Sequence, residues 1–125
     1  MNKKILIIDD EPALLSALVD KFTRAGFTVI MAENGKEGLK AALEKKPDLI
    51  LLDIQLPGID GLETTRRIRK SENCAKIPII AITSFAMVGD RDRCLMAGCT
   101  GYIEKPSKPE TLMEEISFFL EKKEN

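Results

Sequence analysis

The sequence contains no histidine and no tryptophan, and it has only one tyrosine and three cysteines. Without histidine, the chain cannot build a Ser-His-Asp or Cys-His catalytic site, a histidine-ligated metal site, or a phosphohistidine of its own. The cysteines Cys74, Cys94 and Cys99 are odd in number and form no CxxC pair. We therefore interpret them as reduced thiols and not as zinc ligands.

Long apolar runs and an excess of charge of one sign are also missing. The apolar run in "MNKKILIIDDE" is broken by acids after a few residues, so it predicts neither a signal peptide nor a spanning helix, and we expect a cytoplasmic protein without membrane contact. Lys and Arg number 19 and Asp and Glu 20, which leaves no basic surface for nucleic acid. The length of 125 residues predicts one domain, 1–125, without linker or repeat.

Short apolar runs alternate with amphipathic stretches along the whole chain. The runs predict strands at 4–8, 28–32, 48–52, 77–82 and 101–104, and the stretches between them predict helices at 12–25, 35–46, 61–71, 87–97 and 109–123. The runs "KILII" and "DLILL" are continuously apolar, which is typical of parallel strands that are covered on both faces. We therefore predict an open, doubly wound α/β sheet whose site lies beyond the carboxyl ends of the strands.

Polar side chains follow four of the predicted strands: Asp9-Asp10-Glu11, Asp53, Thr83-Ser84 and Glu104-Lys105-Pro106. In a parallel sheet these groups meet at one rim, where the acids would repel one another unless a cation neutralised them. Oxygen ligands with room left for water favour Mg²⁺ over Ca²⁺, and Mg²⁺ of this kind accompanies phosphate chemistry. Lys105 and the Thr83 hydroxyl would then contact phosphoryl oxygens, and Asp53 is the candidate nucleophile.

Other phosphate-handling sites fit the sequence poorly. It has neither a P-loop nor a GxGxxG motif, and the loop "DDEP" after the first strand would repel the phosphate of FMN. The phosphoryl group is therefore expected from a partner or a small phosphodonor. A phosphatase with an aspartyl nucleophile is an alternative, but it needs an acid two residues after the nucleophile, where this chain has Gln55.

With these residues in order, and with "LLDIQLPGIDGLE", "IIAITS" and "GYIEKP" around them, the chain resembles the receiver domain of bacterial two-component response regulators. The resemblance runs from about Lys3 to Lys122. It implies a flavodoxin-like (βα)5 three-layer sandwich with strand order 2-1-3-4-5. Because little follows the last helix, we expect a stand-alone receiver, loosely similar to single-domain cell-cycle regulators; a fragment of a longer regulator is the alternative.

The same resemblance implies a role for each site residue. Asp53 would accept a phosphoryl group from a sensor histidine kinase or a phosphotransfer protein, with a phosphorelay intermediate as a variant of this role. Asp10, Asp53 and the backbone carbonyl of Gln55 would bind Mg²⁺, with Asp9 acting through water. Thr83 and Lys105 would hold the phosphoryl oxygens, and a cis peptide would join Lys105 to Pro106. Beyond self-catalysed phosphotransfer and autodephosphorylation, no enzymatic turnover is expected.

The receiver would change conformation and pass its signal to other proteins through protein–protein contacts. Tyr102 stands at the family's aromatic switch position, although a half-buried core aromatic is the simpler interpretation of one residue. Phe118 falls opposite Leu112, Ile116 and Phe119 on a helical wheel, so we expect it to be exposed. It is either an isolated exposed apolar residue or part of a partner surface on the last two helices and the fifth strand. The resemblance further implies a monomer or a weak dimer; a degenerate receiver is disfavoured because every expected site residue is present.

Overall fold

The computed structural model describes residues 3–56, 58–83, 88–104 and 114–119. In this part of the chain, five parallel strands form one sheet with the order β2-β1-β3-β4-β5. The strands are β1 (Lys4–Ile8), β2 (Thr28–Ala32), β3 (Leu49–Asp53), β4 (Ile79–Thr83) and β5 (Gly101–Glu104). The predicted α/β class and the predicted strand order are both confirmed.

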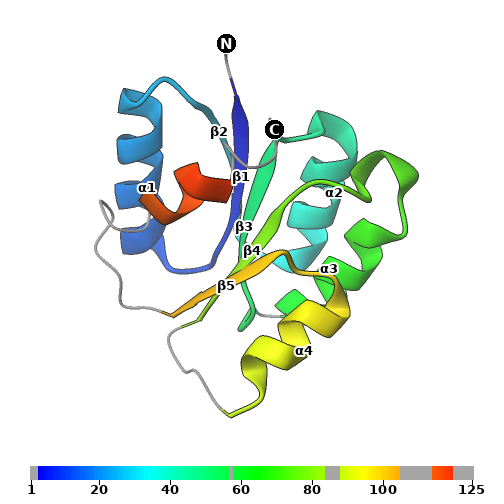
Figure 1. Ribbon diagram of the computed structural model, residues 1–125. Helices are drawn as coiled ribbons and strands as arrows, with labels where there is room; N and C mark the ends of the chain where they lie inside the picture. Colours follow the sequence, from blue (N-terminus) through cyan, green and yellow to red (C-terminus); the bar gives the residue numbers. More distant parts are fainter. Residues whose placement is uncertain (1–2, 57, 84–87, 105–113, 120–125) are drawn as a thin grey trace.

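Helices cover both faces of the sheet, which gives the predicted three layers (Figure 1). The helix α1 and the helical residues 114–119 lie on one face, and α2, α3 and α4 lie on the other (Figure 1). The bounds are Pro12–Arg24 for α1, Gly35–Lys45 for α2, Gly61–Arg69 for α3 and Asp90–Ala97 for α4, with a short 3₁₀ helix, η1, at Glu72–Cys74.

The continuous apolar runs arise because alternate strand residues enter two different cores. Ile5 and Ile7 of β1 pack with Leu18 and Phe22 of α1, whereas Leu6 and Ile8 face the other helices. The second core takes Ala42 from α2, Ile68 from α3 and Cys94 from α4. Full burial of one such Leu or Ile stabilises the fold by about 1.5–3 kcal/mol. The central strands therefore hold the rim residues on a rigid base.

Several element ends differ from the predicted ones by a few residues. The strands predicted to stop at Leu52 and Ile82 continue to Asp53 and Thr83, because the ladder extends through a hydrogen bond from Ile54 N–H to the Ile82 carbonyl (3.1 Å). The helix predicted from Met87 begins at Asp90, because the preceding Gly89 has a left-handed backbone with φ of 87°. Asp53 and Thr83 are thus the last residues of their strands.

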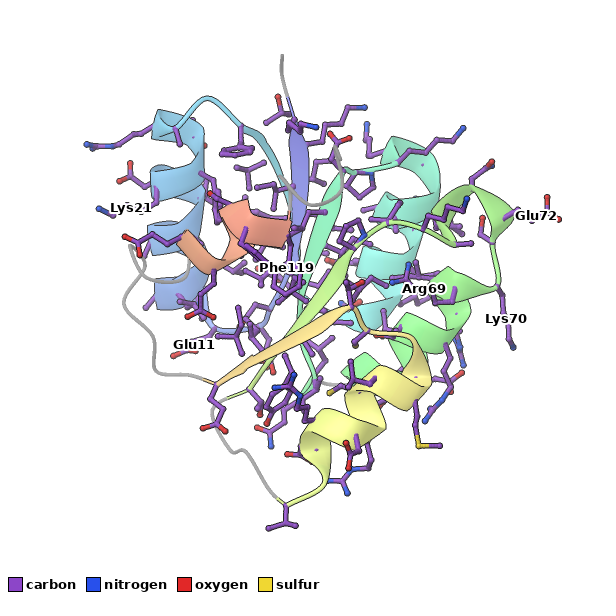
Figure 2. All side chains as sticks on the ribbon, viewed as in Figure 1. Glu11, Lys21, Arg69, Lys70, Glu72 and Phe119 are labelled. Carbon is purple, nitrogen blue, oxygen red and sulfur yellow. The ribbon has the colours of Figure 1, made fainter. Side chains whose placement is uncertain are left out.

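Only residues 114–119 of the predicted last helix are described, and they are helical. Ile116 is buried, and Phe119 is half-buried and lies over the sheet (Figure 2). Phe118 is 60% exposed, so its predicted exposure is confirmed. Among the described residues, no helix is long and apolar enough to cross a membrane.

Candidate phosphoacceptor site

Three predicted site carboxylates meet at the carboxyl edge of the sheet. Oxygens of Asp9, Asp10 and Asp53 all lie within 4.8 Å of one another. Ile8 of β1 pairs with Leu52 of β3, so the next residues, Asp9 and Asp53, lie side by side at the carboxyl edge of the sheet. Asp9 is buried, Asp53 is 5% exposed and Asp10 is exposed, so the cluster opens toward solvent through Asp10.

The buried carboxylates of Asp9 and Asp53 are each held by a local turn of the same kind. The Glu11 N–H donates to Oδ1 of Asp9 (2.8 Å), and the Gln55 N–H donates to Oδ1 of Asp53 (2.9 Å). A carboxylate that bonds the backbone two residues ahead forms an Asx turn, and the bond is charge-assisted. Each turn therefore fixes the orientation of its carboxylate while the chain leaves the strand.

This donor set fits a hard divalent cation. It consists of carboxylate oxygens alone, and the chain has no histidine that would favour a softer metal. Clustered carboxylates that are withdrawn from water repel one another, and a cation between them removes that repulsion. An arrangement with one exposed carboxylate leaves room for water ligands, as Mg²⁺ requires.

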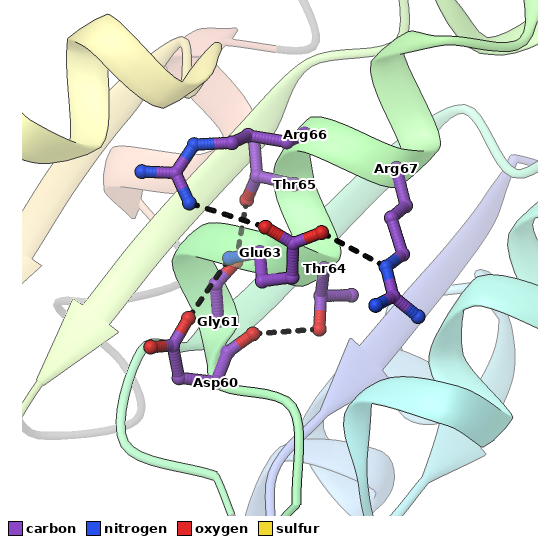
Figure 3. Close-up of polar contacts among 7 residues, drawn as sticks. All are labelled: Asp60, Gly61, Glu63, Thr64, Thr65, Arg66 and Arg67. Atoms are coloured by element: carbon purple, nitrogen blue, oxygen red, sulfur yellow. Dashed lines mark hydrogen bonds and ion pairs between the residues drawn. The ribbon is translucent and has the colours of Figure 1, made fainter.

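The start of α3 packs directly against the backbone of the Asp53 turn. The Gly61 N–H donates to the Ile54 carbonyl (3.1 Å). A Cβ added at Gly61 would lie 2.4 Å from Ile54 Cα and 2.6 Å from the Asp53 carbonyl oxygen. Asp60 caps the helix by accepting from the Glu63 N–H at 2.8 Å (Figure 3). Gly61 was not predicted as a site residue, although the Asp-Gly pair before a helix was a signal for a close approach.

Thr83 and Tyr102 lie on neighbouring strands at the side of the sheet that faces α4. Thr83 is buried at the end of β4, and Tyr102 pairs with Ala81 in β5. Because side chains alternate along a strand, Thr83 and Tyr102 share one face. The Tyr102 ring packs on the core beneath α2, α3 and α4.

The hydroxyl of Tyr102 is buried and has no hydrogen-bond partner among the residues that the structure describes. Burial, followed by the negative charges of Asp90 and Glu104, raises the pKa of Tyr102 above its ordinary value. Among the described residues, the ring is thus held by apolar packing and not by a hydrogen bond of its hydroxyl.

Arg69 of α3 was not predicted to matter, and it joins three separate segments (Figure 2). Its Nε donates to the Gly98 carbonyl (2.8 Å), and its Nη1 donates to the carbonyls of Cys74 (3.0 Å) and Ile77 (2.6 Å). The pattern of an amphipathic helix gives no signal for this role, because the contact with Gly98 joins residues that are 29 positions apart in the chain.

Other predicted site residues stay untested. Lys105, Pro106 and Ser84 lie outside the described residues, as does Leu112 of the last helix. The backbone N–H of Gln55 donates to Asp53, and this hydrogen bond was not predicted. The Gln55 carbonyl was predicted as a metal ligand, and that role stays a prediction.

The sequence model of the response regulator receiver domain matches residues 5–117. The chain belongs to this family. This receiver is 39% identical over 120 residues to the polar-differentiation response regulator DivK of Brucella anthropi, and the match covers 96% of this chain and 98% of that relative. The DivK of Brucella ovis matches with the same identity and coverage. The protein is therefore a signalling receiver of the two-component type.

Solved structures agree with this assignment. The CheY-like receiver domain protein of Methanospirillum hungatei superposes with a TM-score of 0.92 at 31% identity, covering 99% of this receiver and 98% of that chain. The receiver domain of the sensor histidine kinase PA1611 of Pseudomonas aeruginosa gives a TM-score of 0.87 at 33% identity, covering 96% and 98%. That structure has a magnesium ion coordinated in its active site cleft.

Proposed function

We propose that Asp53 of this receiver accepts a phosphoryl group from a sensor histidine kinase or a histidine phosphotransfer protein in the cytoplasm. The observation that carries this proposal is the cluster at the rim, where the Asp53 carboxylate ends a central strand within 4.8 Å of Asp9 and Asp10. A fixed carboxylate beside two further carboxylates is suited to Mg²⁺-assisted phosphoryl transfer. The domain would be the whole of residues 1–125.

Asp10, Asp53 and the Gln55 carbonyl would hold Mg²⁺ directly, and Asp9 would act through a water molecule. When bound, Mg²⁺ would neutralise the charge of the carboxylate and of the incoming phosphoryl oxygens. This metal site rests on the oxygen-only donor set of the cluster.

Several residues of the chain would each have a separate role in the phosphoryl transfer. A carboxylate nucleophile needs no general base, so one oxygen of Asp53 would attack phosphorus while the P–N bond of the phosphohistidine breaks. The Gln55 N–H keeps the carboxylate oriented through Oδ1. The Thr83 hydroxyl, at the end of the adjacent strand, would donate to one phosphoryl oxygen, and Lys105 would pair with another. Hydrolysis of the acyl phosphate by water would then reset the receiver.

Phosphorylation would also change the position of Tyr102. It adds about −1.5 to −2 charges at the rim, which favours movement of Thr83 toward the new oxygens. Tyr102 shares the face of Thr83, and among the described residues its hydroxyl has no hydrogen-bond partner, so a rotation of the ring would break no hydrogen bond to them. The two positions of this pair form a two-state element that one charge can shift.

The output surface would consist of α4, β5 and the last helix. Phe118 is 60% exposed, and Met96 of α4 is 89% exposed. Phe and Met are side chains that are enriched in protein–protein interfaces. A role as a phosphorelay intermediate uses the same site. Turnover of external phosphoesters is disfavoured, because Gln55 stands where a leaving-group acid would be needed.

The test is intact-mass measurement after incubation with Mg²⁺ and acetyl phosphate. We expect wild type to gain one phosphoryl group and Asp53→Asn to gain none. Asp20→Asn serves as the control, because Asp20 is an exposed acid of α1 paired with Arg24. Equal labelling of wild type and Asp53→Asn would contradict the assignment.

A further inference from the structure

Two of the three cysteines lie in the motif that ends α4. The helix ends at Ala97, and Gly98 follows it with a left-handed backbone (φ of 116°). The Gly98 N–H donates to the Leu95 carbonyl (3.1 Å). The Cys99 N–H donates to the Cys94 carbonyl (2.9 Å). These two hydrogen bonds define a Schellman motif, in which the side chains of the outermost two residues commonly contact each other. Here those residues are Cys94 and Cys99.

The hydrogen bond between Cys99 and Cys94 brings their Cα atoms within disulfide range. Bond lengths and angles place a Cα about 1.5 Å from its own N and about 2.4 Å from its own carbonyl oxygen. With an N···O distance of 2.9 Å, the two Cα atoms lie at most about 6.8 Å apart. Disulfides join Cα atoms that are about 4.4–6.8 Å apart. The two side chains also interact with each other within one core.

Cys74 belongs to the same core but not to this motif. It lies in η1, and its Sγ donates to the Ala42 carbonyl (3.5 Å). All three cysteines are free and buried. Cys74 therefore serves as a matched thiol against which the pair can be judged.

The surroundings of the two thiols give them different roles. Burial, followed by the charges of Cys99 and Asp90, raises the pKa of Cys94 to about 12. Burial also raises the pKa of Cys99, but the Thr65 hydroxyl, 3.6 Å from its Sγ, and the charge of Arg69 oppose that rise. The thiolate is the nucleophile in disulfide exchange, so Cys99 is suited to react first and Cys94 to attack second.

Cys99 also has the easier access to solvent. It is 7% exposed, whereas Cys94 is fully buried. It comes shortly before β5, which pairs with β4 alone, and the margin of a sheet opens at the least cost in free energy. We therefore expect a small oxidant to reach Cys99 when this margin opens, with exchange on the order of minutes to hours.

We propose that Cys94 and Cys99 form a redox pair that closes to an intramolecular disulfide, and that this bond restrains Tyr102. The oxidant is a low-molecular-weight disulfide such as oxidised glutathione. The Cys99 thiolate attacks one glutathione sulfur, the S–S bond breaks, and the first glutathione leaves and takes up the proton that Cys99 has lost. The Cys94 thiol then gives up its proton and attacks the Cys99 sulfur, which releases the second glutathione with that proton. Two protein thiols are oxidised, and one disulfide is reduced to two thiols.

The bond would lie in the core on which the Tyr102 ring packs. Cys94 and Cys99 both belong to that core. Their disulfide would tie the last turn of α4 to the residue that leads into β5, so the two elements beside the ring could no longer shift independently. The formation of the bond is independent of phosphotransfer, whereas its effect on the Tyr102 switch rests on the proposed function.

The first experiment detects the bond by mass. Reduced receiver is incubated with oxidised glutathione, its remaining thiols are alkylated with iodoacetamide in urea, and it is digested with trypsin. Trypsin cleaves after Lys76 and after Arg93. Cys94 and Cys99 therefore share one peptide, and Cys74 lies on another. We expect the shared peptide to be lighter by two hydrogen atoms and to take up no iodoacetamide, while the peptide of Cys74 is alkylated.

Single variants assign the two thiols. We expect Cys74→Ala to form the bond like wild type. Cys94→Ala should stop at a mixed disulfide between glutathione and Cys99, whereas Cys99→Ala should stay largely unmodified. No bond in wild type, a bond that includes Cys74, or a mixed disulfide on Cys94 as fast as that on Cys99 would overturn the redox pair.

The second experiment measures the effect of the bond on the switch. Amide shifts of ¹⁵N-labelled receiver are recorded before and after addition of Mg²⁺ and acetyl phosphate, and labelling of Asp53 is followed by mass in the same samples. We expect the shift change of Tyr102 in the disulfide-bonded receiver to be less than about half of that in the reduced one. Cys99→Ala treated with oxidised glutathione should keep the full change. A full change in the disulfide-bonded receiver would overturn the restraint, whereas absence of Asp53 labelling in the reduced receiver would count against the phosphoacceptor assignment alone.

Discussion

Thr83 and Tyr102 lie on the same face of adjacent strands, with Tyr102 paired to Ala81 two residues before Thr83. Movement of the Thr83 side chain therefore changes the space next to the Tyr102 ring. The chain has one tyrosine and no tryptophan, so its near-ultraviolet absorption and fluorescence report on Tyr102 with little other contribution. This makes the predicted switch directly measurable.

The first prediction concerns Thr83→Ala. Acetyl phosphate and Mg²⁺ should change the tyrosine fluorescence of wild type, whereas Thr83→Ala should be phosphorylated on Asp53 with less than half of that change. The reason is that this variant lacks the hydroxyl that would link the phosphoryl group to the ring. Thr23→Ala, at an exposed position of α1, is the control. A full fluorescence change in Thr83→Ala would show that Tyr102 moves independently of Thr83.

The second prediction concerns the ionisation of Tyr102. Its pKa is raised chiefly by burial and then by Asp90 and Glu104, so absorbance at about 295 nm should titrate at a higher pH in the folded protein than in urea. A group whose folded pKa is raised stabilises the fold below its unfolded pKa of about 10, and this contribution is lost as pH rises through the folded value. Tyr102→Phe should therefore lose less stability than wild type above pH ~10. Identical titrations with and without urea would refute this.

The third prediction concerns Gly61→Ala. The new Cβ would lie 2.4 Å from Ile54 Cα, so the backbone of the Asp53 turn must shift, and we expect a loss of about 1–3 kcal/mol in the free energy of unfolding. Phosphorylation by acetyl phosphate should slow as well, because the Asp53 carboxylate loses its fixed orientation. Ile68→Ala, a buried change in the same helix, should lower stability by about 2–5 kcal/mol and leave phosphorylation of the folded fraction nearly unchanged. Equal kinetic effects would contradict the proposed role of Gly61.

The fourth prediction concerns the metal. Asp10→Asn removes one carboxylate of the cluster, and we expect it to weaken Mg²⁺ binding by at least about tenfold, as followed by calorimetry. Asp20→Asn should bind Mg²⁺ like wild type. Addition of excess EDTA should abolish acetyl phosphate labelling of wild type. Unchanged Mg²⁺ affinity in Asp10→Asn would place the ion elsewhere.

Much of this architecture could be predicted from the sequence, because it depends on patterns that are local in the chain. Continuous apolar runs predicted strands buried on both faces, and acids at the ends of two runs predicted the cluster of Asp9, Asp10 and Asp53. The contacts of Arg69 were not predictable in this way. Its acceptors Cys74 and Ile77 lie in one turn soon after α3, but the carbonyl of Gly98 reaches Arg69 only when the end of α4 packs beside α3.

Element ends were predicted less well for a similar reason. Strands were expected to stop where the side chains become polar, yet Asp53 and Thr83 still belong to the ladder, since the Ile54 N–H bonds across to Ile82. Backbone hydrogen bonds, and not side-chain polarity, set the end of a strand.

The strand order has a consequence for amide hydrogen exchange. β3 lies between β1 and β4, whereas β5 pairs with β4 alone. Local opening needs the least free energy at the margins of a sheet and the most at its centre. Asp53 therefore stands on a strand whose amides should exchange only when most of the domain unfolds, and Tyr102 stands on one that can open by itself. The proposed phosphoacceptor thus lies in the slowly exchanging centre of the sheet, and the residue that would transmit its signal lies at the fast-exchanging margin.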